Sequence, residues 1–254
     1  MARGRAQLGE RVSQDNKYKT TLPFWFAELN WSFGPDRVIF GWPDLKRLAL
    51  DGCEIHPSAD PPATPLIDPR ANPALRAIHA RSFGTDDAID ELLAGLHGGI
   101  TELVLDDTRN YTTGSWTTAI SAHLPALAAR LTSLSLLDSP LDSTRLATAR
   151  GAYDALVPSL KCVHRLAINP CALSLLSTLL ALPGLTELTL VSGCAEPVSG
   201  LSCGEVVDYL GRVRGLRRLA LPRKVLGEGV TLEVREVEAV ARERGVELEW
   251  EWRG

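Results

Sequence analysis

The residues able to bind a metal ion are few and poorly grouped in this sequence. Cys53 and His56 lie three positions apart, and Cys162 and His164 lie two apart, which are short spacings of the kind zinc ligands use. Neither pair is followed by a second pair of ligands, and a structural zinc site needs four. We therefore predict no metal ion and no other cofactor.

Residues for acid–base or nucleophilic catalysis are also scattered. The chain has no G-x-S-x-G motif and no glycine-rich phosphate-binding loop. Acidic residues such as Asp36 and the Asp106–Asp107 pair are more typical of helix caps and solvated turns. We therefore expect that the protein is not an enzyme. The alternative is an enzyme that uses His79, His164 or a cysteine, which would require these groups to converge in one pocket.

Composition restricts the class of partner and the compartment. The 254 residues are 23% charged and 45% hydrophobic with a net charge of −4, a globular mixture that lacks the basic excess expected for nucleic-acid binding. No apolar run is long enough for a signal peptide or a membrane span. The odd number of cysteines, five, favours reduced thiols. We expect a monomer in the cytoplasm or nucleus.

One short phrase recurs along the chain and indicates how these residues are positioned. Leu185, Leu188 and Leu190 follow the pattern L-x-x-L-x-L, and similar phrases begin at positions 45, 75, 100, 131, 163, 216 and, loosely, 246. Helical spacing of apolar residues appears between phrases, after Thr85, Ser143 and Ser202 and from Thr231 to Gly245. Strands that alternate with helices predict an α/β fold with parallel strands.

The phrase resembles the leucine-rich-repeat family over residues 36–252. Cys53 and Cys171 end their phrases in a way that is similar to the cysteine-containing subtype found in F-box proteins. The resemblance implies a horseshoe-shaped solenoid of about 7–8 irregular repeats, with strands on the concave face and helices on the convex face. Divergent fungal F-box/leucine-rich-repeat proteins, in which the repeats hold the substrate of a ubiquitin ligase, look most similar. No F-box is recognisable ahead of Leu45.

The chain divides into three predicted regions. Residues 1–21 are expected to be a flexible arm, residues 22–42 an aromatic-rich cap and residues 43–254 the leucine-rich-repeat domain. The alternative for the aromatic region is a docking surface, with Trp25 and Trp31 as its anchors.

Residues between the leucines should project from the concave face and provide a binding surface. The candidates there are Arg47, His79, Glu102, Arg165, Glu187 and Arg218. Because charges alternate across Arg165, Glu187 and Arg218, pairing between neighbouring strands explains these three at least as well as binding does. Candidates on a polar loop are Asn110, Tyr111 and Trp116. The proline-rich loop at 54–72 is expected to be disordered.

These features predict a non-catalytic module that binds another protein. Substrate recognition in an F-box-type ubiquitin ligase, with a cullin-ligase adaptor as a second partner, is the role that the resemblance implies. The alternative is a free-standing scaffolding protein without a ligase connection. Neither nucleic acid nor a membrane is expected as a partner.

Overall fold

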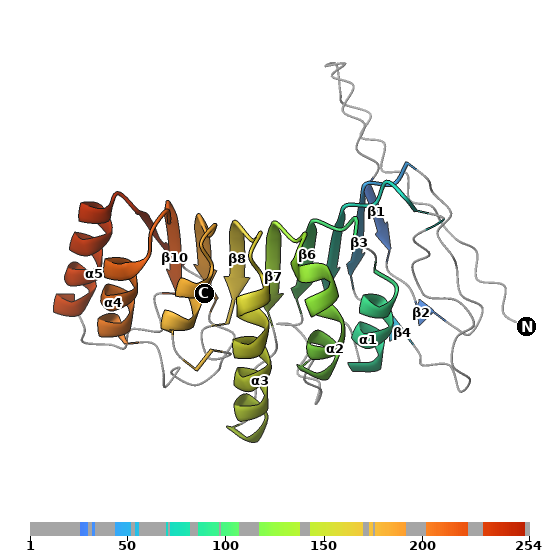
Figure 1. Ribbon diagram of the computed structural model, residues 1–254, viewed down its shortest axis with the longest axis horizontal. Coiled ribbons are helices and arrows are strands. Elements are labelled where there is room, and N and C mark those ends of the chain that lie inside the picture. Colours follow the sequence, from blue (N-terminus) through green and yellow to red (C-terminus); the bar gives the residue numbers. More distant parts are fainter. Residues whose placement is uncertain are drawn as a thin grey trace, which may run out of the picture.

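The fold is an α/β arrangement built on one parallel sheet, as the sequence predicted. The computed structural model describes residues 26–29, 32–33, 44–51, 54–55, 70, 72–81, 86–96, 98–106, 117–137, 143–169, 173–174, 176–191, 202–222 and 231–251. Figure 1 shows the strands side by side along the long axis of the molecule, with the helices in a second layer on one side of the sheet. The sheet therefore has one covered face.

Strand order in the sheet follows chain order. In the part of the chain that the structure describes, the sheet has nine strands, and every pairing between neighbours is parallel. In order across the sheet they are β1 (Phe26–Leu29), β3 (Arg47–Asp51), β5 (Ala77–Arg81), β6 (Glu102–Asp106), β7 (Ser133–Leu137), β8 (Arg165–Ile168), β9 (Glu187–Leu190), β10 (Arg218–Pro222) and β11 (Glu247–Glu251). Parallel neighbours need a crossover between them, and the intervening helices provide most of these crossovers.

The leucines of the repeated phrase form the core beneath the helices. Leu188 aligns with Leu166 on one side and with Leu219 on the other, and each of the three is at most 3% exposed. Successive residues of a strand point to opposite faces, so the buried leucines define the helix-covered face. The predicted alignment of the phrases, including the last one at β11, is confirmed.

The same backbone contact recurs at the start of almost every strand. The N–H groups of Thr186 and Glu187 both donate to the carbonyl of His164, at 2.8 and 3.0 Å. Equivalent pairs of donors occur before β5, β6, β7, β8 and β10. This recurring contact fixes the register of each strand against the preceding one.

Four of the five described α-helices begin at or beside the residues that the sequence indicated, the exception being α2 (Thr117–Ala128). The other four are α1 (Asp86–Ala94), α3 (Ser143–Leu156), α4 (Cys203–Arg212) and α5 (Thr231–Arg244). Ser202 accepts a hydrogen bond from the Glu205 backbone while the Glu205 side chain accepts one from the Ser202 backbone, a complete capping box. Gly245 ends α5 with φ +69°, a conformation that residues with a Cβ rarely adopt.

Four elements were not predicted from the sequence. Strand β1 extends the sheet beyond the first predicted phrase, and β2 (Ser32–Phe33) pairs with β4 (Glu54–Ile55) in a separate small sheet. Helix α2 contains Pro125, which weakened its helical signal, although Ile120, Leu124 and Leu127 are buried at helical spacing.

The apolar segment at 171–182, between β8 and β9, has no α-helix in its described part. The described part of this segment contains a 3-10 helix, η3 (Leu176–Ala181), and a shorter one, η1 (Val157–Ser159), follows α3. The phrases at 163 and 185 are the most closely spaced in the chain, so this connection has little room for an α-helix. A 3-10 helix suits short connections of this kind.

Candidate binding face

The face of the sheet opposite the helices is uncovered by described elements and is termed the open face. Two of its rows of aligned residues have one residue on each strand of the sheet from β3 to β11. The first row contains Arg47, Ala77, Glu102, Ser133, Arg165, Glu187, Arg218 and Glu247, and the second contains Ala49, His79, Val104, Ser135, Ala167, Thr189, Ala220 and Glu249. Apart from Ala77 and Ala220, these residues are half-buried or exposed.

All six residues that were predicted to project from the concave face of the sheet lie on the open face. They are Arg47, His79, Glu102, Arg165, Glu187 and Arg218. Their binding role remains a prediction. The loop candidates Asn110, Tyr111 and Trp116, the docking candidates Trp25 and Trp31, and most of the proline-rich loop lie outside the described residues.

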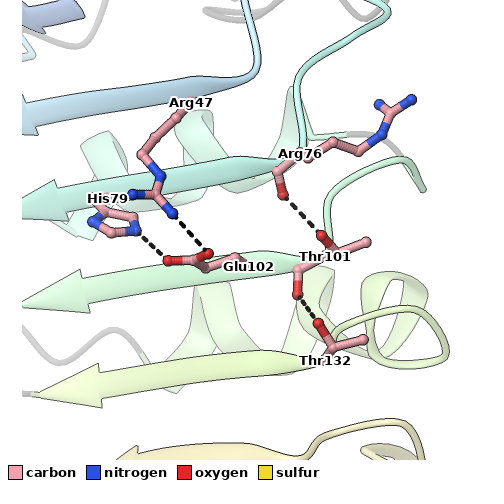
Figure 2. Close-up of polar contacts among 6 residues, drawn as sticks. All are labelled: Arg47, Arg76, His79, Thr101, Glu102 and Thr132. Atoms are coloured by element: carbon pink, nitrogen blue, oxygen red, sulfur yellow. Dashed lines mark hydrogen bonds and ion pairs between the residues drawn. The ribbon is translucent and has the colours of Figure 1, made fainter. Parts of the chain in front are cut away.

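Three polar side chains from neighbouring strands meet at one end of the open face, and we term them the Glu102 cluster. Figure 2 shows the carboxylate of Glu102 on β6 directed toward both Arg47 of β3 and His79 of β5. Oε1 of Glu102 lies 2.6 Å from Nε2 of His79, and Oε2 accepts a hydrogen bond of 3.2 Å from Nη2 of Arg47. Both carboxylate oxygens are therefore engaged, which holds the arginine and the histidine in fixed positions.

A small residue makes the arginine contact possible. Ala77 of β5 lies between Arg47 and Glu102 in the first row. Two strand spacings separate the backbones of β3 and β6, about 10 Å, so a long side chain is needed to span them. The methyl group of Ala77 leaves room for Arg47 to extend over it. A small residue between an arginine and a glutamate in one row, here Ala77 between Arg47 and Glu102, was a signal for this contact that the sequence reasoning missed.

The charges around Glu102 stabilise its ionised form. Partial burial on its own would raise the pKa of Glu102, but the hydrogen bond with His79 and the charge of Arg47 outweigh that effect. The more distant charge of Arg165 acts in the same direction. The pKa of Glu102 is consequently below its ordinary value, and the carboxylate is charged at neutral pH.

The opposite end of the open face has a second ion pair, at a position different from the one predicted. Nη2 of Arg218 donates to both carboxylate oxygens of Glu249, at 2.6 and 2.7 Å. Glu249 lies two positions beyond Glu247, the residue aligned with Arg218, so the pair is diagonal. This hydrogen bond and the charge of Glu249 raise the pKa of the Arg218 guanidinium.

The expected pairing of aligned charges across the C-terminal strands is thus only partly correct. Arg165 aligns with Glu187 and Glu187 aligns with Arg218, as predicted, but among the described residues these side chains form no ion pair with one another. Arg218 turns toward Glu249 instead. Arg165 is exposed and Glu187 half-buried, so both are accessible to a partner.

The centre of the open face is lined by small side chains. Ser133 and Ser135 of β7, Ala167 of β8 and Thr189 of β9 lie between the Glu102 cluster and the Arg218–Glu249 pair. These small residues leave the backbone accessible to close approach, and the accessible charges of Arg165 and Glu187 lie among them in the first row. The face can therefore combine close packing at its centre with orienting ionic contacts at its ends.

Each of the remaining described histidines has a local contact. Nδ1 of His164 donates to the Gly184 carbonyl at 2.8 Å, and a Cβ at Gly184 would lie only 3.1 Å from that nitrogen. Nε2 of His123 on α2 lies 2.9 Å from a carboxylate oxygen of Asp90 on α1. His79 and His164 lie on or beside β5 and β8, three strand spacings apart, about 14 Å. They do not converge.

The described cysteines and carboxylates are dispersed over the fold. Cys162 is exposed and Cys203 is buried, whereas Cys53 and Cys171 lie outside the described residues. Within the described ranges, no three histidine, cysteine, aspartate or glutamate side chains are grouped so that they could hold a metal ion. No helix in those ranges is long and apolar enough to cross a membrane.

Comparison with known proteins finds no family model and no curated protein that matches this chain.

Proposed function

We propose that this protein is a leucine-rich-repeat solenoid that binds another protein on its open face and has no catalytic role. Each strand with the connection that follows it would be one repeat, with L-x-x-L-x-L as its strand phrase. The recurring backbone contact before most of the strands and the alignment of the phrase leucines support this assignment.

The observation that supports the binding role most strongly is the uncovered face of a parallel sheet. Sheets made only of parallel strands are nearly always covered on both faces. Here the helices cover one face, while most open-face residues remain half-buried or exposed. Both ends of that face hold ion-paired side chains, and its centre holds small residues together with Arg165 and Glu187. A macromolecular surface that lies against the open face would cover the side of the sheet that the helices leave uncovered.

Matched arginine substitutions test this proposal. Ser135→Arg introduces a long side chain at the centre of the open face, and Ala122→Arg introduces the same side chain at an exposed position of α2. Tagged wild-type and variant proteins would be purified from the native cells, and the co-purifying proteins quantified by mass spectrometry. We expect a set of proteins that is depleted with Ser135→Arg and retained with Ala122→Arg. Equal recovery with both variants would contradict binding at the open face.

The role in a ubiquitin ligase rests on the sequence resemblance alone. If that role is correct, a cullin-ligase adaptor will co-purify with the wild-type protein from the cytoplasm or nucleus. Because adaptor binding is expected through a region outside the repeats, Ser135→Arg should leave adaptor recovery unchanged. Depletion of other proteins by Ser135→Arg without any adaptor in the wild-type sample would favour the free-standing scaffold.

A further inference from the structure

The C-terminal strand of the sheet has one free edge. Strand β11 is last in the strand order and pairs with β10 alone among the described strands. The N–H of Glu247 donates to the Arg217 carbonyl at 2.8 Å, so the peptide group of Glu247 faces β10. In a parallel strand the N–H and C=O of alternate residues face opposite sides. The peptide groups of Leu248 and Trp250 therefore face outward, as a template for a further strand.

The side chains of β11 determine which kind of strand would fit. Leu248 and Trp250 are half-buried and pack against the core on the helix-covered side. Glu247 and Glu249 lie on the open-face side. Glu249 is engaged by Arg218, whereas Glu247 is exposed and has no ion pair among the described residues. The side chains of an added strand would alternate between two environments. One set would lie beside Glu247 and Glu249 on the open-face side, and the other beside Leu248 and Trp250 on the helix-covered side.

The alternation of charge along the first row indicates which charge would be favoured on a strand added beside β11. From β8 to β11 the row reads Arg165, Glu187, Arg218 and Glu247, so the sign changes at each strand. The next position in the row lies beside Glu247 and would favour a cation, because opposite charges on adjacent strands stabilise pairing. Two β11 strands from separate copies would bring glutamates together, which disfavours self-association through this edge.

We propose that β11 binds an extended segment of another protein by strand addition. The segment has lysine or arginine at alternate positions, facing the glutamates, and apolar residues between them, continuing the layer of Leu248 and Trp250. Backbone hydrogen bonds supply affinity in this mode of recognition, and the alternate side chains supply selectivity. This inference concerns the edge of the sheet and does not rest on binding at the open face.

Labelled synthetic peptides provide the first test. The probe is a seven-residue peptide of alternating lysine and valine, and its matched control has glutamate in place of lysine. Fluorescence polarisation with the whole protein should give about four- to twenty-five-fold tighter binding of the lysine peptide, because attraction of lysine to Glu247 and repulsion of glutamate from it are worth about two- to fivefold each. Absence of lysine-peptide binding, or equal binding of both peptides, would overturn the proposal.

Charge reversal on the protein locates the site. Glu247→Lys should weaken lysine-peptide binding about fivefold and strengthen glutamate-peptide binding, since an attraction becomes a repulsion. Glu236→Lys, an equally charged change at an exposed position of α5, should leave both unchanged. Ser135→Arg should also leave both unchanged. Loss of peptide binding with Ser135→Arg would place the peptide on the open face and refute the edge site without refuting the open-face proposal.

Backbone methylation distinguishes strand addition from charge attraction, and it uses the unaltered protein. Two lysine–valine peptides would be N-methylated on alternate residues, one on the lysines and the other on the valines. Only one of these sets faces β11 when the peptide is an added strand. We expect one methylated peptide to lose at least about tenfold in affinity and the other to bind as before. Equal behaviour of the two peptides would rule out strand addition.

Discussion

Two adjacent residues of β9 should respond in opposite ways to the same substitution. Leu188 is 1% exposed beneath the helices, between Leu166 and Leu219. Its neighbour Thr189 lies on the open face between Ala167 and Ala220. Because side chains alternate between the faces of a strand, Leu188→Asp buries a carboxylate and Thr189→Asp leaves one at the surface.

The cost at Leu188 has two parts. Loss of the buried leucine side chain costs about 2–5 kcal/mol. Burial of the new carboxylate, with a pKa raised by about 3 units, adds about 4 kcal/mol at pH 7. The sum is comparable to the whole stability of a typical domain, about 5–15 kcal/mol. We therefore expect Leu188→Asp to unfold the part of the sheet from β8 to β11, and Thr189→Asp to change stability by less than about 1 kcal/mol.

Urea denaturation followed by circular dichroism measures both effects. The electrostatic part has a defined pH dependence, since a raised pKa in the folded state penalises the ionised form. That penalty should decrease below about pH 7 and vanish near pH 4, where the aspartate is protonated in both states. Equal denaturation midpoints for Leu188→Asp and the wild type would refute the register of β9. A Thr189→Asp variant as unstable as Leu188→Asp would refute the assignment of the two faces.

Three further outcomes are expected from single substitutions. Glu102→Gln should reduce the unfolding free energy by about 1 kcal/mol at pH 7. Because the pKa of Glu102 is lowered from 4.5, the difference from wild type should decrease as the pH falls below 4.5 and disappear once the pH is below the lowered pKa; a difference independent of pH would contradict the ionic cluster. Tyr209→Phe should leave stability unchanged or raise it by about 1 kcal/mol in thermal melts, since the buried hydroxyl has no hydrogen-bond partner among the described residues, and a loss above that amount would show an unrecognised partner. Ser202→Ala should cost about 1 kcal/mol in urea denaturation through loss of the α4 capping box, whereas Glu205→Gln, which keeps the box, should cost less.

Sequence reasoning was most successful where a residue's role depends on spacing along the chain. The leucine phrases predicted the parallel sheet and the face on which Arg47, His79 and Glu102 lie, because a period of two in a strand fixes the face of each residue. Gly245 and Ser202 likewise marked helix ends through local backbone chemistry. These features require no knowledge of distant contacts.

Contacts between strands were harder to predict because they depend on side-chain reach and direction. Arg218 could meet Glu187, Glu247 or Glu249, and only the folded geometry selects the diagonal neighbour. The diagonal contact from His79 to Glu102 arose in the same way. Helix α2 was missed because its proline and two leading threonines lower helix propensity, which burial of one apolar face overrides.

Photo-crosslinking in the native cells tests binding at the open face most directly. A photoreactive aliphatic amino acid would replace Val104, which is half-buried on the open face beside the Glu102 cluster, or Ala122, which is exposed on α2. The account predicts a discrete crosslinked protein from position 104 that position 122 does not give and that Ser135→Arg weakens. Crosslinks from position 122 alone, or none from position 104, would contradict it.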